Sequence, residues 1–278
     1  MKKRTAFILL LFLTLAPAVI LLGFQMRHNQ KYEWEMQDPV PDPPDAEEKA
    51  EFAFARLRYR SYSGGGFGGR GFGGGRYGRR MSWGIDSNRA DRLFEQAVRR
   101  LTRVHSKSVE EVIDVDDGPM FDYPWLYAVE VGHWELSDPQ ARKLREYLDR
   151  GGFLMVDDFH GSREWEVFMM SLRRVFPDRQ VVDIPNGDPI FHMLSDLKDR
   201  IQVPGAQFLR SGNTYEFDGY NAEWRAIYDD KGRIQVAICH NMDLGDAWQY
   251  ADYPAYPAEY ASLALRIAVN YVTYSMTH

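Results

Sequence analysis

The chain has 278 residues, of which 45% are hydrophobic and 14% aromatic, enough for one substantial core. Its formal net charge of -6 argues against nucleic acid as the main partner of the whole chain. The single cysteine, Cys239, excludes an intramolecular disulfide and a zinc site built on several cysteines.

The N-terminus carries an export or anchoring signal. Residues 2–4 are basic and precede an uncharged apolar run over 6–24, long enough as a helix to cross a bilayer. Residues 16–18 fit a cleavage pattern but lie inside the run, so we favour an uncleaved signal anchor over a signal peptide within 1–30. The basic cluster predicts that the rest of the chain lies outside the cytoplasm, in the cell envelope, or is secreted to the periplasm if the segment is cleaved.

Three further regions differ in composition. Residues 31–50 are rich in proline and acids, which predicts a solvated linker. Residues 51–278 form a single predicted domain, interrupted at 63–80 by a glycine- and arginine-rich loop. Interleaved aromatic and arginine residues could bind nucleic acid or an anionic polymer, cover a cleft, or be a tolerated surface insertion.

Strands and helices alternate through the domain. We predict strands over 51–59, 111–115, 125–131, 153–156, 180–184, 225–228 and 234–239, and helices over 87–101, 137–150, 162–176 and 259–274. Helical connections of this length predict a three-layer α/β sandwich with a mainly parallel sheet. Ligands of such folds bind at the carboxyl ends of the strands.

Polar residues follow the predicted strands and are expected to converge at that edge. They are Arg58, Tyr59, His133, Asp157, Asp158, His160, Asn186, Asp188, His240, Asn241 and Asp243. Burying the adjacent carboxylates of Asp157 and Asp158 is costly unless they are paired, yet strand alternation turns them to opposite faces and argues against a dyad.

Three interpretations of the acid pair remain open. The acids could fix the strand-to-helix turn, bind a ligand, or hold a metal with His133, His160 or His240. No metal-spacing motif is present, so we expect no metal and no cofactor. The same alternation turns Cys239 away from His240, and no glycine-flanked turn exposes the thiol, so Cys239 is predicted to be a core residue.

Several motifs occur in an order that resembles a known family. They are FDYPWLY at 121–127, LREYL at 144–148 leading to GGFL at 151–154 and Asp157-Asp158, VFP at 175–177, and NMDLG at 241–245 before Trp248. Together they resemble the bacterial domain-of-unknown-function family numbered 4159, from about residue 51 to the C-terminus. The resemblance implies a flavodoxin-like fold similar to class I glutamine amidotransferases; residues 152–160 are also similar to trehalose-utilisation-type members of that fold.

One departure from that fold family bears on function. Residues 157–159 stand where an amidotransferase would carry its cysteine nucleophile, so we do not expect amidotransferase activity. We expect instead a bacterial inner-membrane-anchored domain, leaning towards non-enzymatic, that binds a small polar or sugar-like ligand or an envelope protein. The binding candidates are Asp157, Asp158, His160, His133, His240, Asn241, Asp243 and Arg58. One alternative is a glycan or amide hydrolase using Asp157 or Asp158 as base with His160 or His240; the other is anionic-polymer binding through residues 63–80.

Overall fold

The computed structural model describes residues 41–61 and 82–278. The predicted anchor, the first part of the linker and the glycine- and arginine-rich loop lie outside these residues. Within the described part, no helix combines the length and apolar character needed to cross a membrane. The end of the linker lies against the domain, since Asp45 accepts a 2.7 Å hydrogen bond from Arg99.

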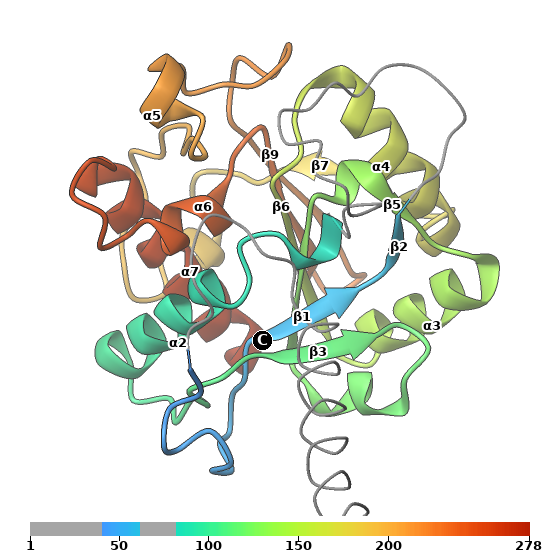
Figure 1. The fold of residues 1–278 in the computed structure, drawn as a ribbon. Coiled ribbons are helices and arrows are strands. Elements are labelled where there is room, and N and C mark those ends of the chain that lie inside the picture. Colours follow the sequence, from blue (N-terminus) through green and yellow to red (C-terminus); the bar gives the residue numbers. More distant parts are fainter. Residues whose placement is uncertain (1–40, 62–81) are drawn as a thin grey trace, which may run out of the picture.

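A seven-stranded, mostly parallel sheet forms the centre of the domain (Figure 1). In spatial order its strands are β3 (Glu111–Asp114), β1 (Ala55–Arg58), β4 (Trp125–Val129), β6 (Phe153–Asp157), β9 (Ile234–His240), β8 (Glu223–Tyr228) and β7 (Val182–Asp183). The first five are parallel, and β8 is antiparallel to both β9 and β7. Numbered along the chain, the five parallel strands have the order 2-1-3-4-5, a common doubly wound arrangement. A separate antiparallel pair joins β2 (Arg60–Ser61) to β5 (Trp134–Glu135).

Helices cover both faces of the sheet (Figure 1). One face carries α2 (Arg89–Leu101) and α7 (Ala258–Thr277), and the other carries α3 (Asp138–Asp149) and α4 (Gly161–Val175). The remaining helices are short: α5 (Phe208–Ser211), α6 (Leu244–Gln249), and the 3-10 turns η1 (Ser82–Gly84), η2 (Gly118–Asp122), η3 (Val131–His133) and η4 (Pro189–Phe191).

The period of two along each strand divides the core between the two faces. On β4, Trp125 and Tyr127 pack towards α2 and α7, whereas Leu126 and Ala128 pack towards α3 and α4. All these side chains are fully buried, as expected for parallel strands covered on both faces. The predicted mixed α/β fold with a mainly parallel sheet is therefore confirmed.

Local sequence signals fix several boundaries. Ser137 and Gln140 form a capping box at the start of α3, in agreement with the predicted helix over 137–150. The predicted strand over 180–184 is reduced to the two exposed residues of β7 at the sheet edge. Helix α6 was not predicted, because its six residues are too few to show a helical period.

A buried ion pair connects β1 to α2. Arg56 Nε donates to Asp91 Oδ2 at 2.9 Å, and both side chains are fully buried. Arg56 Nη1 also donates to the carbonyl oxygens of Trp83 at 3.1 Å and Ile85 at 2.9 Å. Arg56 therefore holds the turn that leads to Asp86 against the sheet.

Removing both partners of this pair should cost less than the sum of the costs of removing each one. We expect Asp91→Leu to lower the free energy of unfolding by about 3–5 kcal/mol, because it leaves the Arg56 charge buried without its counter-ion. The double variant Arg56→Met/Asp91→Leu should lose clearly less than the sum of the two single variants. Urea unfolding of all three variants measures this, and additive losses would contradict it.

Glu95, on α2, is a second buried ionisable group. Its Oε1 accepts a 2.8 Å hydrogen bond from the Phe54 N–H, whereas Oε2 has no hydrogen-bond partner among the described residues. Burial raises the pKa of Glu95 from its ordinary value of 4.5 to about 8, against the opposing effect of the Phe54 hydrogen bond. Folded Glu95 therefore keeps a proton that the unfolded chain releases.

Glu95 should make the domain less stable as pH rises. Because its pKa is raised on folding, its contribution is most favourable below about pH 4.5 and is lost as pH rises to about 8. Over this range Glu95 should lower the free energy of unfolding of wild type by on the order of a few kcal/mol. We expect this loss to be absent in Glu95→Gln, which keeps the acceptor for Phe54. Unfolding measured from pH 5 to 9 tests this beside an exposed Glu146→Gln control, and parallel pH profiles for wild type and Glu95→Gln would be the contrary result.

Candidate functional site

The carboxyl ends of β6 and β9 meet at one edge of the sheet. Beyond the strands, backbone hydrogen bonds join Asp158 N–H to the Met242 carbonyl at 3.1 Å and Asn241 N–H to the Phe159 carbonyl at 3.0 Å. These bonds bring the predicted residues Asp157, Asp158 and Asn241 into one neighbourhood, with Asp243 two residues further on. The convergence expected from the parallel topology holds for this group.

Asp157 ends β6 and is fully buried. Its Oδ2 accepts hydrogen bonds from the Tyr127 hydroxyl at 3.0 Å and from the N–H groups of Leu244 at 2.8 Å and Gly245 at 3.0 Å. Its Oδ1 has no hydrogen-bond partner in the described part of the chain. Burial raises the pKa of Asp157 to about 7, although the three hydrogen bonds oppose the rise.

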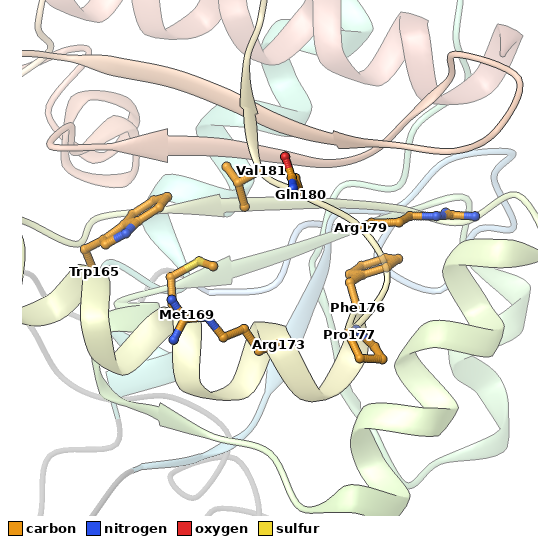
Figure 2. A pocket seen from close by; sticks show the side chains of 8 residues that line it. All are labelled: Trp165, Met169, Arg173, Phe176, Pro177, Arg179, Gln180 and Val181. Carbon is orange, nitrogen blue, oxygen red and sulfur yellow. The ribbon is translucent and has the colours of Figure 1, made fainter.

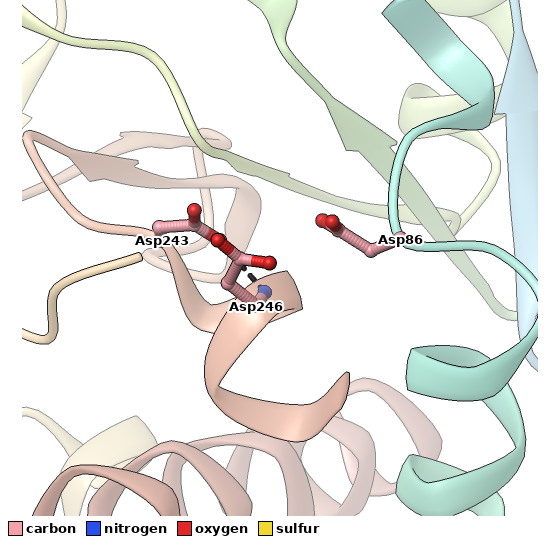
Figure 3. Close-up of side chains that lie close together, drawn as sticks. All are labelled: Asp86, Asp243 and Asp246. Carbon is pink, nitrogen blue, oxygen red and sulfur yellow. Dashed lines mark hydrogen bonds between the residues drawn. The ribbon is translucent and has the colours of Figure 1, made fainter. Parts of the chain in front are cut away.

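Asp243 gathers with two acids that the sequence did not single out. Ligand oxygens of Asp86, Asp243 and Asp246 all lie within 4.8 Å of one another. Figure 3 shows that Asp243 and Asp246 come from the start of α6, whereas Asp86 reaches across from the turn before α2. Burial, and then the negative charges of Asp158, Asp246 and Asp86, raise the pKa of Asp243 well above its usual range.

Asp158 lies just past the end of β6, and its side chain has a different neighbour from that of Asp157. Its backbone has a φ of 50°, in the left-handed region, and its Oδ1 lies 3.2 Å from His160 Nε2. Burial and the nearby charge of Glu130 raise the pKa of Asp158 well above its usual range. Burial lowers the pKa of His160 to about 4, so this imidazole is neutral at neutral pH.

The N-terminus of α4 is closed by acceptors of the protein itself. Glu164 Oε2 accepts the His160 N–H at 2.6 Å, Asn241 Oδ1 accepts the Gly161 N–H at 2.8 Å, and Asp218 Oδ1 accepts the Ser162 N–H at 2.9 Å. Free N–H groups at a helix N-terminus are what bind anions in many doubly wound proteins. Here two carboxylates and an amide occupy them, so this helix does not offer a phosphate site.

The remaining predicted residues have other roles or positions. Arg58 donates to Asp114 Oδ1 at 2.7 Å on β3, and Tyr59 donates to the Val129 carbonyl at 2.6 Å. His133 lies 3.5 Å from Glu164, whose hydrogen bond raises the pKa of the imidazole.

The structure also places two more of the predicted residues, His240 and Asp188. His240 stacks on Phe159 at 4.8 Å between ring centroids, and its Nε2 lies 3.2 Å from the Gly161 carbonyl oxygen. The expectation that Asp188 joins this edge is wrong. It accepts the hydroxyl of Tyr228 at 2.7 Å, at the opposite end of β8, because the chain turns back after the short β7.

Cys239 is fully buried, and burial raises the pKa of its thiol well above the usual range. A buried thiol that resists ionisation is a poor nucleophile. The prediction that Cys239 is a core residue is therefore confirmed, and the structure gives this thiol none of the features of an amidotransferase nucleophile.

A pocket of about 630 Å³ lies elsewhere, between α4 and the segment that enters β7 (Figure 2). Its lining residues are Trp165, Met169, Arg173, Phe176, Pro177, Arg179, Gln180 and Val181. None of the predicted binding residues lines it. The strand-end cluster has the converging buried polar groups that the pocket lacks, so it is the better candidate site.

The fold and site define a class: a doubly wound α/β domain with an acidic cluster at the carboxyl edge of its sheet. Comparison with known families then places the chain in one of them. It belongs to the family described as Domain of unknown function (DUF4159), which matches residues 54–276. No curated protein matches the chain.

The contacts around Gly161 generate a stability prediction. Gly161 has a φ of 71°, and a Cβ atom there would lie 2.0 Å from Asp218 Oδ1. We expect Gly161→Ala to lower the free energy of unfolding by at least roughly 1–2 kcal/mol, the cost of the left-handed conformation alone. Gly187→Ala is the matched control, since its Cβ would meet nothing within 4 Å. Equal denaturation midpoints for the two variants would refute this description of the turn.

Proposed function

We propose that this domain binds a small, hydroxyl-rich, sugar-like ligand at the carboxyl ends of β6 and β9. The carrying observation is the acidic cluster itself. Five aspartates, Asp86, Asp157, Asp158, Asp243 and Asp246, are concentrated where ligands bind in doubly wound domains. Carboxylates accept hydrogen bonds, so the complementary ligand is one that donates them.

The charge of this edge favours neutral over anionic ligands. The N–H groups at the start of α4 and α6 already donate to Glu164, Asp218 and Asp157. A nearby buried cation, Arg56, is engaged with Asp91. A phosphate or carboxylate ligand would therefore meet like charges and few available donors.

The cluster also has a side from which a ligand could enter. Asp158 is only partly buried, and so are three of the acids whose charges act on it, Glu130, Glu216 and Asp246. These four side chains come from segments after β4, β6 and β9 and from the chain before β8. The ligand would lie across them, with the buried Asp157 beneath.

Two features favour hydrolysis of a glycan or amide as a second candidate function. The pKa of Asp157 is raised to about 7, in the range of a general base, and its Oδ1 has no hydrogen-bond partner among the described residues. Asp158 and His160 lie within 3.2 Å of each other. If the domain is a hydrolase, the wild-type protein should turn over the glycan, and Asp157→Asn and Asp158→Asn should abolish that turnover. If the domain only binds its ligand, the wild-type protein should bind without any turnover.

The predicted cellular location of the domain extends this proposal. The apolar run near the N-terminus supports a bacterial envelope protein with a single membrane anchor, so that the acidic edge would meet envelope glycans or proteins. The topology supports a fold similar to that of class I glutamine amidotransferases. A similar fold does not imply the same chemistry. Anionic-polymer binding through residues 63–80 stays a prediction, because these residues are not described.

Thermal unfolding of the full-length protein with mono- and oligosaccharides tests the proposal. At ten times its Kd, a ligand stabilises the native state by ~1.4 kcal/mol and raises Tm by roughly 3–5 °C. We expect such a shift with at least one sugar and none with inorganic phosphate, and we expect Asp158→Asn to abolish it.

The control for this experiment is Asp230→Asn, because the Asp230 side chain is 95% exposed on the β8–β9 turn. This variant should keep the full shift. A shift with phosphate but with no sugar, or a sugar shift that survives Asp158→Asn, would overturn the proposed site.

A further inference from the structure

We propose that Asp86, Asp243 and Asp246 bind a divalent cation, for which Ca²⁺ is the best fit. The site deepens the proposed function, since the ion would lie in the same acidic edge and could hold ligand hydroxyls through its open coordination positions. The cation itself can be tested without any sugar.

The three carboxylates already lie close enough together to share one ion. Their ligand oxygens lie within 4.8 Å of one another, and Asp86 and Asp243 are 2% and 5% exposed (Figure 3). Asp243 Oδ1 accepts the Asp246 N–H at 2.7 Å, which fixes the orientation of its carboxylate. Asp246 Oδ2 accepts the Ala206 N–H, which fixes the orientation of the Asp246 carboxylate as well.

A second, independent observation concerns the space around Gly205. A Cβ atom on this residue would lie 2.2 Å from Asp243 Oδ2, 2.7 Å from Gln207 Oε1 and 2.8 Å from Asp246 Oδ2. Three oxygens from separate side chains thus converge on one point beside the backbone. The side-chain amide of Gln207 is buried at both its oxygen and its nitrogen, and neither atom has a hydrogen-bond partner in the described part of the chain. An amide oxygen that has no hydrogen-bond donor and lies next to two carboxylates is well placed to coordinate a cation.

Gly245 makes room for the oxygens on the other side. A Cβ atom there would lie 2.5 Å from Asp86 Oδ2 and 2.9 Å from the Tyr127 hydroxyl oxygen. That hydroxyl donates to Asp157, which is fully buried with its Oδ1 unpartnered among the described residues. The glycines at 205 and 245 therefore stand where any larger side chain would displace oxygen atoms of the cluster.

The donor set selects the class of cation. Carboxylate and amide oxygens suit Ca²⁺, Mg²⁺ and Mn²⁺, whereas Zn²⁺ sites use histidine or cysteine. Ligands on opposite sides of Ca²⁺ are about 4.6–5.2 Å apart and those of Mg²⁺ about 4.0–4.2 Å apart. Oxygens that all lie within 4.8 Å of one another are compatible with the wider coordination sphere of Ca²⁺.

Calorimetric titration of the chelator-treated full-length protein with CaCl₂ tests the site. We expect saturable binding of one ion per chain, and at least tenfold weaker binding in both Asp246→Asn and Gly205→Ala. Asp246→Asn keeps an oxygen for the Ala206 N–H, so it tests the charge without removing that contact. Gly187→Ala and Asp230→Asn are the matched controls and should bind Ca²⁺ as wild type does.

Two outcomes would overturn the proposal: no saturable Ca²⁺ binding by wild type, or equal binding by wild type and Asp246→Asn. Circular dichroism checks that each variant is folded, and Asp246→Asn decides the matter if Gly205→Ala is not. The titration contains no sugar, so Ca²⁺ binding without any sugar-induced shift would defeat the proposed function alone. A sugar-induced shift in a protein that does not bind Ca²⁺ would defeat the cation site alone.

Discussion

The burial of carboxylates at one edge of the parallel sheet is the constraint on which the rest of this molecule depends. An ionised carboxylate removed from water is costly unless hydrogen bonds or an opposite charge replace the lost solvation. Asp91 meets this requirement with Arg56, and Asp157 meets it partly with a hydroxyl and two N–H groups at the start of α6. Asp243 accepts the N–H of Asp246, and repulsion from the neighbouring acids adds to burial in raising its pKa. A cation or a hydrogen-bond-donating ligand would remove that cost.

The same edge differs from the binding edge of many domains with this fold. Doubly wound domains often bind phosphate because helix N-termini at the carboxyl ends of the strands present free N–H groups. In this protein Glu164, Asn241 and Asp218 bond to those groups at the start of α4. Glycine is required at 161, because a Cβ atom there would overlap with the carboxylate of Asp218. The fold is retained, while the N–H groups with which many such domains bind anions are bonded here to side chains of the protein.

Much of the framework could be predicted from the sequence, and the cluster only in part. Buried runs such as 153–157 and the capped start of α3 carry their signals locally, so the central strands and main helices were found. Topology alone then placed Asp157, Asp158, Asn241 and Asp243 together. Asp86, Asp246 and Gln207 were missed because they come from a turn, a six-residue helix and an irregular segment, none of which has a periodic pattern. Arg58 follows a strand as predicted but pairs with Asp114 on β3, whereas His133 pairs with Glu164, which also accepts the His160 N–H.

The most direct test of this account is a crystal structure grown with Mn²⁺, located by its anomalous scattering. The account predicts a peak between Asp86, Asp243 and Asp246, with oxygens of these side chains, and of Gln207, completing the coordination together with water. A cluster in which these carboxylates bond to one another or to water, with no anomalous peak between them at saturating Mn²⁺, would contradict it.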